Sequence, residues 1–236
     1  MDNIYTIIPV SQFTNAKTRL SPFLSPEERE NLLKAMLKDI AIILKQFVDK
    51  IFIISKDKNV LAFAEELGLN TIIEKDHPKT INLKASDNSG LNIALNQAME
   101  SIKNKTKKVI ILPSDIPLIG KTNIKLLIEK SEKNDFIIVP SKGGGTNMLI
   151  TKPLAIDMKF GEFSFKRHIE EAKKNKLNYT IHDSFYLALD VNTTEDLGEI
   201  MIHGDGTKTK EYLESLGINV ESIHGHERLK VNRKIE

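Results

Sequence analysis

The apolar residues of this sequence fall into short runs, and most of these runs are separated by stretches with helical spacing. Runs of this length are typical of buried strands and are far below the roughly 20 residues of a membrane span. The segments predicted as strands are Ile4–Val10, Ile51–Ile54, Thr71–Ile73, Val109–Leu112, Phe136–Val139, Met148–Ile150 and Tyr186–Leu189. Several are apolar on both faces, which indicates a parallel sheet covered by helices on both sides.

The helical stretches have recognisable starts. Ser25 is a good N-cap, Pro26 suits the first turn and Glu28 completes a capping box. The other stretches predicted as helices are 60–67, ended by Gly68, 92–102, 124–131, the segment after Ser164, and one that starts at Thr193 or Thr194. Strands and helices alternate to about residue 140 and become mixed afterwards, which predicts an α/β fold with right-handed crossovers.

The pattern predicts one main domain over residues 1–200. The last segment, 201–236, is less periodic and holds several glycines among charged residues, so we expect a C-terminal appendage whose role is unknown.

Composition narrows the class of protein. The chain has 236 residues, 40% hydrophobic and 28% charged, with a net charge of +2 and no cysteine. These values are ordinary for a soluble globular protein, and they give no basic field for nucleic acid and no thiolate metal site. The N-terminus does not resemble a secretory leader, so we expect a cytoplasmic protein without a membrane partner.

Chemistry is expected in the loops that follow the apolar strands, because ligands gather at the carboxyl ends of the strands in open α/β sheets. Asp115 follows the run Val109–Leu112 and is flanked by Pro113 and Pro117, which restrict the backbone. A carboxylate at this position can hold a divalent cation beside phosphate oxygens. Capping of a turn is the competing interpretation.

The loop after the first strand, 15–21, carries Lys17 and Arg19. Two cations at this position can bind a polyphosphate, although a solvated surface loop has the same composition. The loop lacks the glycines of a P-loop, which disfavours an NTPase of the Walker type.

A third loop holds Asp190 and Asn192, whose alternation places both side chains on one face of an extended chain. Oxygen ligands at this spacing suit Mg²⁺. Helix capping explains Thr193 and the acidic residues after it, but it does not explain Asp190.

Two further segments are compatible with anion binding. Gly161 and Ser164 precede a helix and can form an anion site or a plain N-cap, and Gly143–Asn147 is either a flexible turn or an anion nest. The histidines show no clustered ligand spacing, so a zinc site is not expected.

The motifs in their order along the chain closely resemble those of the CofC family of archaeal 2-phospho-L-lactate guanylyltransferases. The matching segments are Ile8–Val10, Ala16–Pro22, Leu24–Arg29, Ser89–Leu95, Pro113–Leu118, Gly145–Asn147, Phe160–Phe165 and Asp190–Leu197. This resemblance implies a Rossmann-like, three-layer nucleotidyltransferase fold of the GT-A type with a mostly parallel mixed sheet. It also implies a reaction of GTP with (2S)-2-phospholactate in the biosynthesis of the deazaflavin coenzyme 420, and it makes a homodimer plausible.

The resemblance assigns roles to individual residues. Asp115, Asp190, Lys17 and Arg19 are expected to be catalytic. The residues expected to lie near the nucleotide are Lys17, Thr18, Arg19, Ser89, Gly90, Leu91 and Asn92. Thr146, Gly161 and Ser164 are expected to hold the acceptor. Asp115, Asp190 and Asn192 are expected to hold Mg²⁺.

Asn192 departs from the family pattern, where this position is usually Asp, and this weakens the expectation of a second metal ion. The alternatives are phosphoenolpyruvate as acceptor, which bacterial relatives use, another nucleotidyltransferase acting on a sugar phosphate or a molybdopterin, and a non-catalytic GTP-binding protein.

Overall fold

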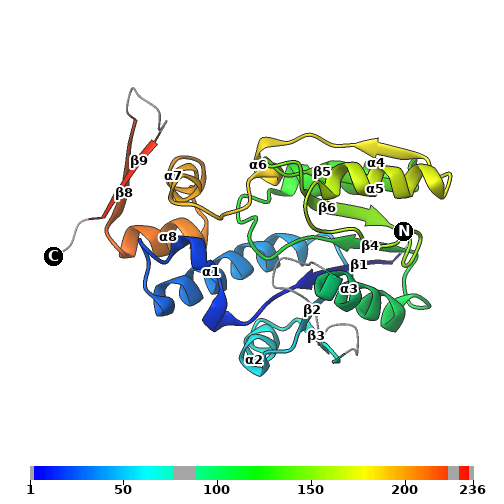
Figure 1. The fold of residues 1–236 in the computed structure, drawn as a ribbon, viewed down its shortest axis with the longest axis horizontal. Helices are drawn as coiled ribbons and strands as arrows, with labels where there is room; N and C mark the ends of the chain where they lie inside the picture. Colours follow the sequence, from blue (N-terminus) through cyan, green and yellow to red (C-terminus); the bar gives the residue numbers. More distant parts are fainter. Residues whose placement is uncertain (1–2, 77–88, 223–228, 234–236) are drawn as a thin grey trace.

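The computed structural model describes residues 3–76, 89–222 and 229–233 (Figure 1). The strands are β1 (Ile4–Pro9), β2 (Lys50–Ser55), β3 (Asn70–Ile73), β4 (Lys108–Ile111), β5 (Phe136–Pro140), β6 (Thr146–Thr151), β7 (Tyr179–Ile181), β8 (Ile218–Ser222) and β9 (Leu229–Arg233). The α-helices are α1 (Pro26–Leu44), α2 (Lys58–Glu66), α3 (Ser89–Ile102), α4 (Lys121–Ser131), α5 (Ser164–Lys174), α6 (Phe185–Ala188), α7 (Thr194–His203) and α8 (Lys208–Ser215). Two 3₁₀ turns, η1 (Phe13–Asn15) and η2 (Thr18–Leu20), follow β1.

Seven strands form one sheet in the order β3-β2-β1-β4-β6-β5-β7. Strand β6 is antiparallel to both neighbours, β4 and β5, whereas all other pairs are parallel. The prediction of a mostly parallel mixed sheet is therefore confirmed.

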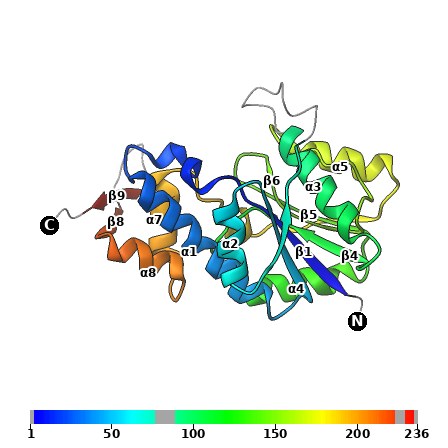
Figure 2. The same ribbon diagram turned by 90° about the horizontal axis from the view of Figure 1, so that it is seen from below.

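Helices cover both faces of the sheet, which makes three layers. One buried cluster joins α3 and α5 to the sheet, and the other joins α1, α2 and α4 to the opposite face. Figure 2 shows α3 and α5 together on one side and α4 on the other. The central strands therefore bury both faces, as the sequence predicts.

The start of α1 matches its prediction in detail. Glu28 N donates to Ser25 Oγ at 3.2 Å, and Ser25 N donates to Glu28 Oε2 at 2.8 Å. Both bonds use only residues within one turn, so the sequence alone determines this cap.

The prediction of a strand over Tyr186–Leu189 is wrong. Residues Phe185–Ala188 form the short helix α6, and Leu189 follows in extended conformation. Four apolar residues fit a buried turn of helix as well as a strand, and here Leu187 packs into the core while Phe185 and Tyr186 lie exposed.

The C-terminal segment contains more regular structure than the sequence suggests. Helix α8 packs across α1, and the hairpin of β8 and β9 packs against α7 at the end of the molecule away from the main sheet (Figure 1).

None of the helices among the described residues combines the length and the apolar character of a membrane span. The boundary at residue 200 stays a prediction, and it falls inside α7.

Candidate active site

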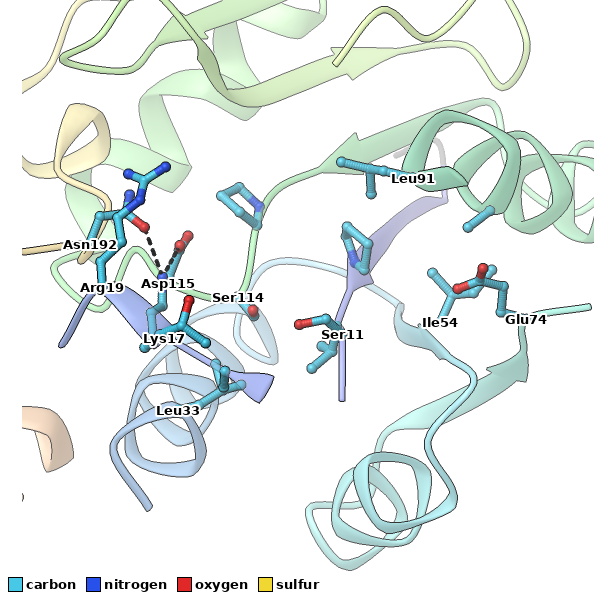
Figure 3. A pocket seen from close by; sticks show the side chains of 16 residues that line it. Ser11, Lys17, Arg19, Leu33, Ile54, Glu74, Leu91, Ser114, Asp115 and Asn192 are labelled. Atoms are coloured by element: carbon cyan, nitrogen blue, oxygen red, sulfur yellow. Dashed lines mark hydrogen bonds and ion pairs between the residues drawn. The ribbon is translucent and has the colours of Figure 1, made fainter. Parts of the chain in front are cut away.

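Three loops at the carboxyl edge of the sheet bring together side chains that are far apart in sequence. The Lys17 ammonium forms an ion pair with the Asp115 carboxylate, and it lies 3.4 Å from Asn192 Oδ1. Figure 3 shows these three side chains converging on one point, with Arg19 beside them. The three loops that the sequence singles out are therefore in direct contact at this edge of the sheet.

Lys17 is held in an unusual backbone conformation between η1 and η2. Its φ of 52° and ψ of 42° are left-handed, a region that most residues with a Cβ avoid. The buried Arg29 fixes the loop on both sides, because Nε donates to Ala16 O at 3.1 Å and Nη1 donates to Leu24 O at 2.8 Å. The backbone strain at Lys17 is thus retained in a loop that directs the Lys17 ammonium at Asp115.

Asp115 follows β4 and connects two of the loops. Its backbone carbonyl accepts a hydrogen bond from Val191 N at 2.9 Å, which ties the segment after β4 to the segment after α6. Its Oδ2 faces Lys17, whereas its Oδ1 is buried and has no hydrogen-bond partner among the described residues. A buried acceptor without a partner is costly, so this oxygen is suited to bind a ligand.

Asp190 lies beside Asp115, and its surroundings disfavour its charge. Burial raises the pKa of the Asp190 carboxyl, and the negative charge of Asp115 raises it further. Asn147 and Lys17 oppose this shift, and Asn192 Nδ2 donates a hydrogen bond to Asp190 Oδ2. Two carboxylates that repel each other in a partly buried site favour the arrival of a cation.

The loop that carries Asn192 is fixed by Asp196 at the start of α7. Asp196 Oδ2 accepts hydrogen bonds from Asn192 N and Thr193 N, both at 2.8 Å, and Lys142 Nζ lies 2.5 Å from Asp196 Oδ1. The capping interpretation therefore holds for Thr193 and Asp196, while Asp190 and Asn192 remain directed at the site.

The residues present fit a divalent cation with oxygen ligands. Asp115 Oδ1 is buried and has no partner among the described residues, the Asp190 carboxylate lies beside Asp115, and the Asn192 amide contacts Asp190. Within residues 3–76, 89–222 and 229–233, no group of three or more His, Cys, Asp or Glu side chains could hold a metal. Two carboxylates match Mg²⁺, which commonly uses one or two carboxylates together with substrate phosphates.

A cavity of about 470 Å³ extends from this cluster along the sheet edge, between α1 and α3. Lys17, Thr18 and Arg19 line one end, together with Asp115 and Asn192. Thr18 and Arg19 are exposed, and the Arg19 guanidinium makes no hydrogen bond or ion pair with another described residue. This end of the cavity therefore offers a free cation beside the Lys17 ammonium.

The predicted nucleotide segment 89–92 opens α3 at the edge of this cavity. Leu91 lines the cavity, and Gly90 lies in the first turn of the helix. The Asn92 amide pairs with the backbone of Phe160 through bonds of 2.8 and 3.1 Å. The side chain of Ser89 lies outside the described part of the chain, so its predicted role stays a prediction.

A second cavity, of about 410 Å³, lies on the other side of Asp115. Its lining includes Thr146, Gly161 and Ser164, the three residues predicted to hold the acceptor, together with Asp115 and Asp190. Ser164 Oγ donates to Thr146 Oγ1 at 3.2 Å. Asp115 and Asn192 are among the residues that line both cavities, so a molecule in each would meet at these residues.

The sequence missed His168, which orients the hydroxyls of the second cavity. His168 is fully buried, and burial lowers its pKa from 6.5 to about 4, so the ring is neutral near pH 7. Lys159 N donates to His168 Nε2 at 3.0 Å, which leaves the proton on Nδ1, 3.0 Å from Thr146 Oγ1. The Thr146 oxygen accepts from both His168 and Ser164, and its own proton is left to donate to a ligand.

A signal for His168 exists in the sequence, because it lies four residues after Ser164 on one face of a helix.

Two backbone N–H groups at the start of this helix are already used in hydrogen bonds within the protein, so they are not free to bind an anion. Ser164 N donates to Gly161 O at 3.1 Å and Phe165 N donates to Gly144 O at 3.3 Å. The side-chain hydroxyls, rather than these two backbone groups, are therefore the available donors.

Comparisons with known proteins identify the family of this chain. The model of a family described as guanylyl transferase CofC like matches residues 4–234. A 2-phospho-L-lactate guanylyltransferase from Methanobrevibacter ruminantium is 70% identical, covering 99% of this chain and 100% of that protein. One from Methanothermobacter thermautotrophicus is 49% identical, covering 96% and 97%.

Solved structures share the fold at low sequence identity. CMP:2-keto-3-deoxy-manno-octonic acid synthetase, complexed with CTP, has a TM-score of 0.55 at 10% identity and covers 85% of this chain and 97% of its own. 4-Diphosphocytidyl-2C-methyl-D-erythritol synthase from Anaerococcus prevotii has a TM-score of 0.54 at 10% identity, covering 90% and 99%. The Rossmann-like, nucleotidyltransferase type of fold that the resemblance implies is confirmed. With a family match that spans nearly the whole sequence and full-length relatives at high identity, the chain belongs to the CofC-like guanylyl transferase family.

Proposed function

We propose that this protein is a 2-phospho-L-lactate guanylyltransferase. It joins the guanylyl group of GTP to (2S)-2-phospholactate and forms lactyl-2-diphospho-5′-guanosine and pyrophosphate, a step in the biosynthesis of coenzyme 420. Relatives that carry this activity in their names are similar over their whole length. The observation that carries the proposal is the position of Asp115, which lines both cavities and has one buried oxygen that no described residue contacts by a hydrogen bond.

The reaction requires two anions to meet. An oxygen of the acceptor phosphate attacks the α-phosphorus of GTP, a new P–O–P linkage forms, and the bond from the α-phosphorus to the leaving pyrophosphate breaks. No protein nucleophile is needed, so the protein contributes positioning and charge neutralisation. GTP in the first cavity and the acceptor in the second bring the reacting atoms together at Asp115.

Asp115, Asp190 and the Asn192 carbonyl are the residues that would hold Mg²⁺. When bound, the ion would neutralise charge on the phosphate oxygens between the two cavities. Asn192 also donates to Asp190, so it limits the mutual repulsion that a third carboxylate would add. We therefore expect one tightly held ion at Asp115 and Asp190.

The cations of the first loop act on the leaving group. Lys17 is fixed by its left-handed backbone and by Asp115, whereas Arg19 is exposed and free of other contacts among the described residues. Arg19 can therefore follow the pyrophosphate and offer it a bidentate contact, while Lys17 stays beside the reacting phosphate.

The acceptor is held by hydroxyls. The Thr146 proton points away from His168 and Ser164, because both of these residues donate to the Thr146 oxygen. A neutral, oriented hydroxyl suits a carboxylate or phosphate oxygen of the acceptor.

Release of pyrophosphate tests the proposal. Purified protein is mixed with GTP and Mg²⁺, and with either 2-phospholactate or phosphoenolpyruvate. We expect turnover with 2-phospholactate, and we expect none when the divalent ion is removed by a chelator. Absence of pyrophosphate with both acceptors would contradict the proposal, and turnover only with phosphoenolpyruvate would change the acceptor. Mass spectrometry of the product distinguishes these outcomes from simple hydrolysis of GTP.

A further inference from the structure

The first cavity ends in a carboxylate that neither the motifs nor the proposed chemistry explains. Among the described residues that line this cavity, the carboxylates are Asp115 and Glu74. Figure 3 places them on opposite sides, with Lys17 and Arg19 near Asp115, and with Ile54 near Glu74. If the triphosphate lies at Lys17, the far end of the same cavity receives the base.

The walls between the two ends suit a flat ring. Leu91 and Ala94 of α3 and Ile54 of β2 line the cavity, and Figure 3 shows Leu91 and Ile54 on opposite sides of the space next to Glu74. Apolar side chains on two sides with one polar group at the end are the usual lining of a pocket for an aromatic ligand.

The backbone around Glu74 is fixed from two directions. Glu74 N donates to Ser55 O at 2.9 Å, which extends the pairing of β2 and β3 by one residue. The Gln97 side chain of α3 holds both neighbours, since its Nε2 donates to Ile73 O at 2.8 Å and its Oε1 accepts from Lys75 N at 2.9 Å. A glutamate on such a rigid segment is placed before the ligand arrives.

Lys56 lies near the Glu74 carboxylate at this end of the cavity. Lys56 Nζ lies 3.7 Å from Glu74 Oε1, outside the cavity lining, and the Glu74 side chain is 22% exposed. Burial raises the pKa of the Glu74 carboxyl, and Lys56 opposes that shift. Lys56 thus favours the ionised carboxylate without occupying the cavity.

We propose that Glu74 recognises the guanine base, and that its two oxygens accept hydrogen bonds from guanine N1–H and the N2 amino group. This inference rests on the proposed function. Guanine alone among the common bases presents two adjacent donors on its Watson–Crick edge, and they match the two oxygens of a carboxylate. Adenine N1 and cytosine N3 would present a lone pair to the same carboxylate, which is repulsive. Glu74 is therefore a specificity residue, and Gln97 is the residue that positions it.

The test compares Glu74→Gln with Glu66→Gln, a matched loss of charge on the exposed end of α2. The affinity of each protein for GTP and for inosine triphosphate, which lacks the N2 amino group, is measured by calorimetry with Mg²⁺ present. The kcat/KM for both nucleotides is measured with 2-phospholactate. Glu74→Gln should lower kcat/KM for GTP by about 100-fold and bring the preference for GTP over inosine triphosphate close to one. The KM for 2-phospholactate should stay unchanged, and Glu66→Gln should behave as the wild type.

An unchanged GTP preference in a folded Glu74→Gln variant would overturn the inference. Glu74→Ala serves as a second variant, and thermal unfolding of both variants verifies that each is folded. Failure of the proposed function has a different signature, because the wild type would then release no pyrophosphate. The nucleotide affinities would still decide the role of Glu74 in that case.

Discussion

Two aspartates in this chain, the buried Asp39 and the half-buried Asp115, have opposite surroundings. Asp39 of α1 accepts hydrogen bonds from Lys208 N at 2.7 Å, Thr209 N at 2.9 Å and Thr209 Oγ1 at 2.6 Å. Asp115 has Lys17 on one oxygen and, among the described residues, nothing on the other. Asp39 therefore holds α8 against α1, whereas one oxygen of Asp115 has no hydrogen-bond partner among the described residues.

The difference separates structural acids from functional ones. A buried carboxylate whose acceptors are filled by the protein contributes to stability, and removing it leaves buried donors without partners. A buried carboxylate with a free oxygen contributes little to stability and is available for a ligand. Substitutions at the two positions should thus change different quantities.

Asp115→Asn should abolish most of the activity while the fold persists. We expect the rate of pyrophosphate release to fall by about 1,000-fold or more, because the charge between the two cavities is lost. The free energy of unfolding should change by about 1 kcal/mol or less, because asparagine keeps an oxygen that can accept from Lys17 and removes the charge repulsion with Asp190. Steady-state kinetics and urea unfolding measure the two quantities.

The control for this variant is Asp183→Asn, which removes an exposed carboxylate outside the lining of both cavities. It should retain wild-type turnover. A folded Asp115→Asn protein with near-normal activity would show that Asp115 is not a catalytic residue.

Asp39→Ala should have the reverse profile. We expect the free energy of unfolding to fall by about 3 kcal/mol, because the first N–H groups of α8 lose a charged acceptor in a buried place. The kcat of the folded protein should remain at the wild-type value. Asp205→Ala, at an exposed carboxylate paired with Lys210, should cost far less stability. Equal unfolding energies for the two variants would contradict the comparison.

His168 makes stability depend on pH. Burial lowers its pKa from 6.5 to about 4, so the unfolded chain takes up a proton at a higher pH than the folded chain does. The folded state therefore loses stability as the pH falls from about 6.5 toward 4, and it keeps this contribution above pH 6.5. In His168→Gln, the loss of stability between pH 7 and pH 4.5 should be smaller by about 2 kcal/mol.

Urea unfolding at the two pH values measures this difference, with His203→Gln as a control at a partly exposed histidine. Identical pH dependence in the wild type and His168→Gln would show that the ring is not held neutral by the fold.

Arg233→Gln should have the smallest effect. Arg233 of β9 pairs with Glu28 at the start of α1, and both side chains are partly exposed. Because solvent screens such pairs, we expect a loss of stability in urea unfolding that is close to the limit of detection and disappears in high salt. A salt-independent loss as large as that of Asp39→Ala would show that the pair behaves as a buried one.

The features that could be predicted from the sequence are those that depend on residues close to one another in the chain. The Ser25 and Glu28 cap, the buried central strands and the strand-end position of Asp115 depend on neighbours in sequence, and each was predictable from pattern alone. The link from Asp39 to Thr209 spans 170 residues, and no periodicity marks it. Glu74 could not be predicted either, because only the folded chain shows that it lines the cavity.

Short apolar segments were the main source of error in the fold. Residues 185–189 contain too few positions to distinguish a turn of helix from a strand, and the outcome is set by packing of Leu187. The role of His168 could not be predicted, because only the folded chain shows that Thr146 and Lys159 fill its two nitrogens.

The left-handed backbone at Lys17 has a consequence for anyone who redesigns this chain for thermal tolerance. A search that scores only backbone preference would replace Lys17 with glycine or asparagine, since those residues accept a φ of 52° with less strain. That substitution would remove the ammonium next to Asp115. Position 17 is thus one where optimisation for stability and selection for catalysis disagree, and it is best held constant in any stabilised version of the enzyme.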